Sequence, residues 1–155
     1  MAVIRVGLEL NYEDRALAWA LDYPGCFAYG EAGPQAIIAL APALVRYQAW
    51  VNRNAGVRQI DLGDFDLRLV ETWTVYSMDD NYEETPEGYA VNAWFKSDWK
   101  PLSAAEIEHG LALLRWSRAD LLALAADLTP QQLDEKQPGE RWSLRGILRH
   151  VANSE

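Results

Sequence analysis

Short runs of alternating apolar and polar residues open the chain. Residues 3–10 place an apolar side chain at every second position, which is the period of a half-buried strand. Residues 16–21 and 26–29 form two further apolar runs, and the Pro-Gly pair between them is a strong turn signal. The pattern therefore predicts an opening meander of three short strands.

Helical spacing follows this meander. From Pro34 to about Asn52 the apolar residues recur three and four positions apart, as on the core-facing side of a helix. Pro34 suits the first helical turn, because an N–H group has no helical partner there. Pro42 lies inside the predicted helix, so we expect a kink or a break at that point. Residues 64–78 alternate again and predict a fourth strand.

An acidic stretch and then an aromatic stretch occupy residues 79–102. Residues 79–88, with the sequence DDNYEETPEG, predict a loop or a lid. Residues 89–99 fit either an additional strand or an extended arm, so 79–102 is a linker, a lid or an extra strand. The acids of the loop do not have the spacing of an EF-hand, and a solvated loop is the better interpretation.

A long helix is predicted to begin after Ser103. Ser103 and Glu106 have the spacing of a capping box, and apolar residues then recur at helical intervals to about Asp127. Thr129 and Ser143 are candidate N-caps of two later helices. We therefore expect an amphipathic helical segment over residues 103–155.

These elements predict an α+β protein of two unlike modules. The first is a small β-β-β-α-β domain over residues 1–78, and 79–102 connects it to the helical segment 103–155. We expect that segment to be an incomplete domain, because two long amphipathic helices bury their apolar faces only when something covers them. A second copy could provide that cover, so we predict a homodimer.

Composition and charge restrict the function. The chain is 50% hydrophobic and has a net charge of −9 with no run of basic residues. A packed core is expected, while binding to nucleic acid is not, since phosphate neutralisation needs clustered cations. The start has no charged and apolar leader, and no apolar stretch is long enough to span a membrane, so we expect a cytoplasmic chain without membrane contact. Cys26 is the single cysteine and is expected to be a small core residue.

Residues 23–30, YPGCFAYG, followed by GPQA at 33–36 and a helix, resemble the HicB-like family. The resemblance implies that residues 1 to about 75 form a degraded double-stranded-RNA-binding-like domain with the order β-β-β-α-β. In toxin–antitoxin systems such a domain covers a small ribonuclease. The resemblance therefore implies an antitoxin, whose acidic surface would suit a small basic ribonuclease as protein partner.

Residues 114–155 resemble the start of a DinB-like four-helix bundle. The resemblance rests on LTP at 128–130 and on the run GERWSLRGILRHVANSE at 139–155. In that family, the histidine at the place of His150 is the first of three ligands to a divalent metal such as Zn or Ni, and the other two come from a later helix. Some members are thiol-dependent transferases or isomerases, so the resemblance implies a metal-dependent enzyme if other residues or a subunit complete the site.

The chain has two histidines, His109 and His150, and no motif for a catalytic mechanism. His150 could supply one metal ligand, but Glu155 follows at five residues, which is poor spacing on a helix. A partly exposed histidine is the better interpretation, and no cofactor is expected in this chain. The leading hypothesis is therefore a non-catalytic binding or regulatory protein.

Tryptophan is unusually frequent, with seven residues in the chain. Trp73, Trp94 and Trp99 lie on either side of the acidic loop. Because tryptophan is enriched where surfaces meet, they could bury a seam between modules or subunits, and ordinary core positions are the equal alternative.

Overall fold

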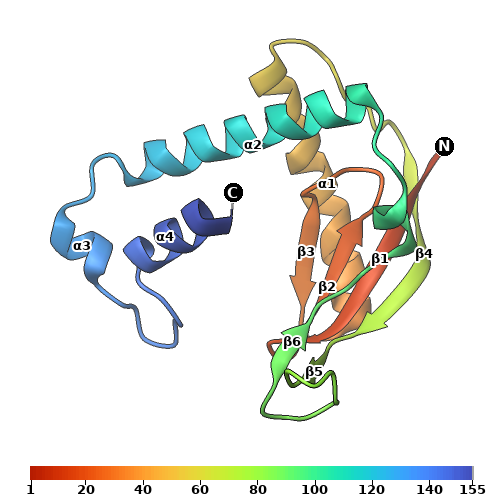
Figure 1. Cartoon of the computed structure of the whole chain (residues 1–155). Coiled ribbons are helices and arrows are strands. Elements are labelled where there is room, and N and C mark those ends of the chain that lie inside the picture. Colours follow the sequence, from red (N-terminus) through yellow and green to blue (C-terminus); the bar gives the residue numbers. More distant parts are fainter. Residues whose placement is uncertain (155) are drawn as a thin grey trace. The chain divides into compact units, whose positions relative to one another are not determined.

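The computed structural model describes residues 1–154, and the chain divides into two compact units, residues 1–107 and 108–155. Strands and one long helix form the first unit, and helices form the second (Figure 1). The predicted α+β class is confirmed. Among the described residues, no helix combines the length and the apolar character that a membrane span requires.

A four-stranded sheet and one helix form the body of the first unit. The strands are β1 (Ala2–Tyr12), β2 (Arg15–Ala20), β3 (Phe27–Gly30) and β4 (Phe65–Thr74), and α1 (Gly33–Ala55) connects β3 to β4. Their order in the sheet is β3-β2-β1-β4, with β1 antiparallel to β2 and parallel to β4. The predicted order β-β-β-α-β is therefore observed.

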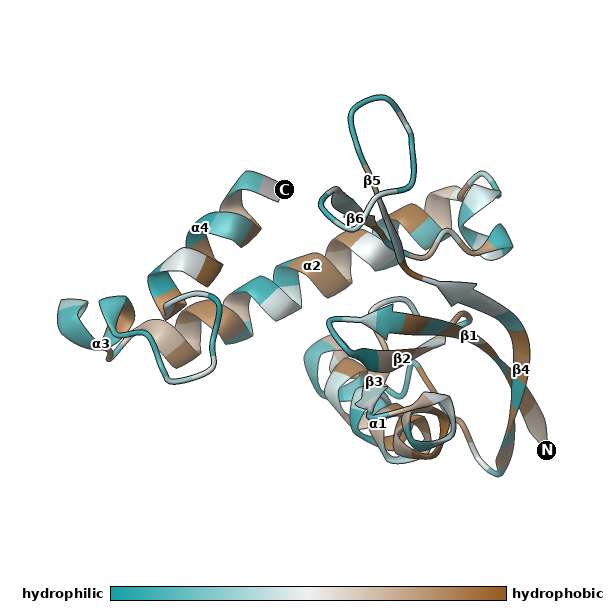
Figure 2. Ribbon diagram, turned by 90° about the horizontal axis from the view of Figure 1, so that it is seen from below, coloured by the Kyte–Doolittle hydropathy of each residue, from teal (hydrophilic) through white to brown (hydrophobic). Residues whose placement is uncertain are grey.

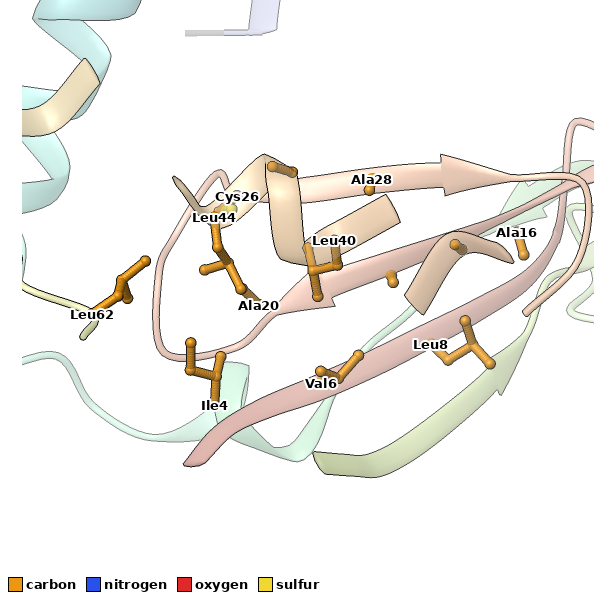
Figure 3. Packing of buried hydrophobic residues seen from close by; sticks show 13 residues of the cluster. Ile4, Val6, Leu8, Ala16, Ala20, Cys26, Ala28, Leu40, Leu44 and Leu62 are labelled. Atoms are coloured by element: carbon orange, nitrogen blue, oxygen red, sulfur yellow. The ribbon is translucent and has the colours of Figure 1, made fainter. Parts of the chain in front are cut away.

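The core lies between the sheet and α1. Side chains at alternate positions of β1 point toward the helix, and Ile4 and Val6 are at most 2% exposed. Leu40 and Leu44 of α1 are fully buried against them, as Figure 3 shows. The other core positions are mostly alanines, which let the helix approach the sheet closely. These alanines are Ala16, Ala18, Ala20, Ala28, Ala36 and Ala43.

Pro42 does not break α1, contrary to one of the two expected outcomes. The helix is continuous from Gly33 to Ala55, with Pro42 inside it. A proline removes one hydrogen bond and crowds the carbonyl four residues earlier, here that of Ile38. Pro42 is exposed and Ile38 is 74% exposed, so this disturbed part of the helix faces solvent and the core face is unaffected.

The acidic loop is the tip of a hairpin. Strands β5 (Tyr76–Met78) and β6 (Tyr89–Val91) pair antiparallel and close it, and Figure 2 shows the hydrophilic loop between them. Asp79 Oδ1 accepts from the backbone N of Glu83 at 3.0 Å and of Asn81 at 2.8 Å. These bonds favour the carboxylate and lower the pKa of Asp79. A 3-10 turn, η1 (Lys96–Trp99), follows β6, so residues 79–102 include an additional strand.

The later helices are α2 (Ala104–Ala125), α3 (Pro130–Asp134) and α4 (Leu144–Ser154). The capping box at the start of α2 is confirmed, since Glu106 N donates to Ser103 Oγ at 3.3 Å and Ser103 N donates to Glu106 Oε2 at 2.8 Å.

The single apolar stripe predicted for α2 is only partly realised. Leu113 is its only buried residue among those described, and hydrophobic and hydrophilic residues alternate along its ribbon (Figure 2). Leu114 is 56% exposed and Leu124 is 79% exposed. Much of the apolar surface of α2 is therefore exposed to solvent.

Candidate functional site

The face of the sheet that points away from α1 carries the most distinctive group of side chains. Cross-strand pairing places Glu9 beside Leu17 and Leu17 beside Tyr29. The same pairing places Gly7 beside Trp19 and Trp19 beside Phe27. Because directly paired residues project to one side, these side chains share the face opposite the core.

A segment of residues 92–99, here called the crossing segment, is hydrogen-bonded to this face. Ala93 N donates to Glu9 Oε1 at 2.7 Å, and Lys96 N donates to Glu71 Oε2 at 3.0 Å. Between these two anchors the ring of Phe95 lies over Gly7 and is 4% exposed. A Cβ atom at Gly7 would lie 2.7 Å from that ring, so the close approach requires glycine at this position.

The crossing segment and the sheet together border an open hollow of about 660 Å³. That volume lies in the range of small-molecule sites, which are concave and mostly apolar with a few polar groups. The aromatic wall is continuous, with Trp19 and Phe27 rings 5.0 Å apart and Phe27 and Tyr29 rings 5.6 Å apart. The ionisable residues of the lining, tyrosines included, are Glu9, Tyr12, Tyr29 and Asp98.

Glu9 is the buried charged residue of this hollow. It is 2% exposed, and its Oε2 accepts from Trp19 Nε1 at 3.1 Å while Oε1 accepts from Ala93 N. No Lys, Arg or His among the described residues forms an ion pair with it. Two neutral hydrogen-bond donors therefore hold this carboxylate, and no cation of the described chain pairs with it.

A cation lies close to the aromatic wall without belonging to the lining. The Arg15 guanidinium lies 4.5 Å from the centroid of the Tyr29 ring and pairs with Glu13 Oε2 at 3.3 Å. Tyr12 packs against Tyr29, with ring centroids 6.4 Å apart. Burial, and then the charge of Glu13, raise the pKa of the Tyr12 hydroxyl, which therefore stays protonated at neutral pH.

The sequence pattern did not predict this site, and the reason can be identified. Glu9 follows the period-two pattern of β1, which indicates a solvent-facing side chain, and Ala93 is 84 residues away. Two signals were available: an acidic residue in a strand, and tryptophan and phenylalanine on the supposedly exposed side of the next strands. Neither signal identifies the crossing segment, because periodicity reports only local structure.

The two histidines of the chain lie on different helices, His109 on α2 and His150 on α4. His150 is exposed on α4, and its ring centroid lies 4.5 Å from that of Trp142. His109 is half-buried on α2. Within the part of the chain that the structure describes, no three His, Cys, Asp or Glu side chains cluster as a metal site would require. Glu155 lies outside the described residues, and the DinB-like resemblance takes the other two ligands from a later helix.

The interpretation of Cys26 as a core residue is confirmed. Its side chain is 4% exposed, and burial raises the pKa of the thiol to about 11. Tyr47 lies nearby and donates to the carbonyl of Pro24 at 2.9 Å, while burial raises its pKa to about 12. Both groups are therefore neutral at physiological pH, and neither is prepared to act as a nucleophile.

The tryptophans around the acidic loop have two different environments. Trp73 Nε1 donates to the carbonyl of Val91 at 3.2 Å and so ties β4 to the hairpin. Trp94 and Trp99 are 68% and 70% exposed, and their rings contact each other nearly at right angles, with centroids 6.1 Å apart. They are not ordinary core residues, and their predicted place in a seam stays a prediction.

Comparison with known proteins finds one family. Residues 113–155 match the family model of the DinB superfamily, which spans most of α2 together with α3 and α4. The helical segment is therefore similar to that superfamily, as its sequence indicated. No curated protein and no solved structure matches the chain. The HicB-like resemblance of the first 75 residues is not supported by any of these comparisons.

Proposed function

We propose that this chain is a non-catalytic binding or regulatory protein that takes a small ligand in the hollow on the open face of its sheet. The observation that carries the proposal is the buried Glu9 carboxylate inside an aromatic hollow of about 660 Å³. Convergent polar groups in a mostly apolar concavity are the usual features of a ligand site. All residues that line the hollow belong to the first unit.

A screen of a fragment library with equal numbers of cationic, neutral and anionic compounds tests this proposal. We expect hits by saturation-transfer NMR with the wild-type chain, and weaker signals with Phe27→Ala, which removes one ring from the wall. Val45→Ala is a matched control, because Val45 is 54% exposed on α1 and does not line the hollow. The proposal would be contradicted if no compound of the library bound, or if no compound gave a weaker saturation-transfer signal with Phe27→Ala than with the wild-type chain.

We also propose that the helical unit associates with a second copy of itself. Leu121, Leu128 and Ile147 line an apolar groove of about 150 Å³ between α2 and α4. Ile147 is 37% exposed, so part of this surface is open to solvent. Two such pairs of helices would build a four-helix arrangement with a covered core and would bring two His150 side chains into one assembly.

Light scattering coupled to size exclusion tests the dimer at micromolar concentration. The mass of one chain is 17.5 kDa, and we expect the wild-type protein to show twice this mass. Ile147→Glu places a charge in the groove and should give a monomer. Ala152→Glu adds the same charge to an exposed position of α4 and should leave the dimer intact. A strictly monomeric wild-type chain would exclude this mode of association.

The HicB-like resemblance supports a regulatory role for the first unit. The order β-β-β-α-β and the YPGCFAYG turn fit that family, and the acidic charge of the chain suits a small basic ribonuclease as partner. If the chain acts as an antitoxin, a pull-down should recover a small basic protein. Failure to recover one would count against the antitoxin and would leave the ligand proposal untouched.

A metal-dependent enzyme is the second candidate, and the DinB superfamily match at residues 113–155 favours it. In this proposal His150 is one of three ligands, and the others come from residues or a subunit outside this chain. Metal analysis after purification should then find stoichiometric Zn or Ni that disappears in His150→Ala. His109→Ala is the control, since His109 lies on another helix and should not affect the metal content.

A further inference from the structure

We infer that the hollow on the open sheet face accepts the positively charged end of a small organic molecule, an ammonium or guanidinium group on an apolar body, with Glu9 as its counter-ion. The inference rests on the proposed function and specifies the chemical class of the ligand. It depends on the charge of the lining, the rings around it and the unused hydrogen-bonding capacity of Glu9.

The charge of the lining favours a cation. Two carboxylates, Glu9 and Asp98, line the hollow, and no Lys, Arg or His is among its lining residues. Asp98 Oδ2 accepts from Phe95 N at 3.2 Å, so this carboxylate is fixed by the turn of the crossing segment. An anionic ligand would face two like charges, which makes its binding unfavourable in a partly desolvated site.

The rings add a second attraction for a cation. The face of an aromatic ring carries partial negative charge and attracts ammonium and guanidinium groups. The molecule itself provides an example at the edge of the same wall, where the Arg15 guanidinium lies over the Tyr29 ring. Trp19 and Phe27 continue that wall into the hollow.

Glu9 has acceptor capacity that the protein does not use. A carboxylate offers roughly four acceptor positions. The structure occupies two of them, with Trp19 Nε1 on Oε2 and Ala93 N on Oε1. Both donors are neutral, so neither balances the charge. A ligand ammonium group would supply the missing donors and the missing positive charge together.

The competing explanation is that Glu9 only anchors the crossing segment. Glu71 separates the two explanations, because it anchors the same segment through Lys96 N at 3.0 Å but does not line the hollow. Glu71→Gln should therefore weaken the anchor without changing ligand preference. Glu9→Gln should weaken the anchor and also remove the preference for a cation.

Calorimetric titration with three indole probes of matched shape tests the inference: tryptamine, a cation; tryptophol, which is neutral; and indole-3-propionate, an anion. A hydrogen bond to a charged group contributes about 1.5–3 kcal/mol, so we expect tryptamine to bind roughly 10–100-fold more tightly than tryptophol. Indole-3-propionate should bind least. Equal affinity for tryptamine and tryptophol, or tighter binding of the anion, would overturn the inference.

The variants complete the test. Glu9→Gln should bring tryptamine and tryptophol to similar affinity, whereas Glu71→Gln should keep the wild-type ratio. If Glu9→Gln does not fold, the ratio of tryptamine to tryptophol affinity in the wild-type chain still tests the inference. Phe27→Leu tests the place of binding, because it should weaken the binding of both probes. Fragment hits that are all neutral or anionic would refute the cation inference while sustaining the proposed ligand site. A screen without any hit at the hollow would refute the proposed function itself.

Discussion

Replacing Gly7 with alanine is expected to loosen the crossing segment from the sheet. The added Cβ atom would lie 2.7 Å from Cζ of Phe95 and 2.9 Å from its Cε2, so the whole outer edge of the ring is affected. Ordinary contact begins at 3.4 Å, and the ring must therefore retreat by about 0.7 Å. Phe95 is 4% exposed, so its ring can make this shift only by moving out of its packed position over Gly7.

The size of the effect follows from the packing. Adding a methyl group to a well-packed site costs about 1–3 kcal/mol, and we expect about 2 kcal/mol here because the ring is nearly buried. This free energy is lost from the packing of the crossing segment on the sheet. The segment is held there by the amides of Ala93 and Lys96, which donate to carboxylates of the sheet. If that segment opens locally, the two amides should exchange roughly 30-fold faster with solvent deuterium.

Amide hydrogen exchange measured by NMR checks this expectation. Ala93 and Lys96 should lose protection in Gly7→Ala, while the amides of α1 change less. Gly110→Ala is the matched control, since nothing lies within 4 Å of the new Cβ atom there and alanine favours a helix. Unchanged exchange at Ala93 and Lys96 in Gly7→Ala would refute the packing that we describe.

Three further expectations concern the core, a helix cap and the thiol. Leu44→Ala removes a fully buried side chain and should lower the free energy of unfolding in urea by about 2–5 kcal/mol, whereas Val45→Ala at an exposed position should change it by less than about 0.5 kcal/mol. Hydrogen bonds from Lys100 and from Ser103 lower the pKa of Glu106 to about 2, below its usual 4.5. The stabilisation of the helix start by ionised Glu106 is therefore complete above pH 4.5 and is lost as the pH falls toward 2, which an NMR titration of wild type and Glu106→Gln would show. Burial raises the pKa of Cys26 to about 11, so a thiol reagent at pH 8 should label it slowly in the native chain and rapidly in urea; fast native labelling would contradict its burial.

The sheet and its helix could be predicted because their signals are local. Alternation over residues 3–10, the Pro-Gly turn and helical spacing after Pro34 each report on adjacent residues, and the structure contains the corresponding elements. The effect of Pro42 could be predicted only as two alternatives. Its outcome depends on which side of α1 faces the sheet, and tertiary packing decides that.

The candidate site could not be predicted, because it is formed by contacts between distant parts of the chain. Glu9 and Ala93 meet only when the hairpin β5–β6 has brought the crossing segment back over β1. Glu9 has the ordinary appearance of a polar residue in a half-exposed strand. Only the structure shows that the crossing segment buries it.

The helical segment 103–155 shows the complementary case. The capping box at Ser103 and Glu106 was predicted from four residues of sequence, and its hydrogen bonds confirm it. The resemblance to the DinB superfamily was also predicted and is supported at residues 113–155. Local signals of this kind cannot predict what packs against the apolar residues of α2, because that packing depends on how the helices assemble.

Titration of the ¹⁵N-labelled chain with tryptamine tests the ligand site most directly. Trp19 Nε1 and Ala93 N both donate to Glu9, so their NMR signals report on its carboxylate from two sides. We predict that both signals shift with one dissociation constant, while the indole signal of Trp142 on the helical unit does not move. Binding of tryptamine that leaves the Trp19 and Ala93 signals unchanged would contradict a ligand site at Glu9.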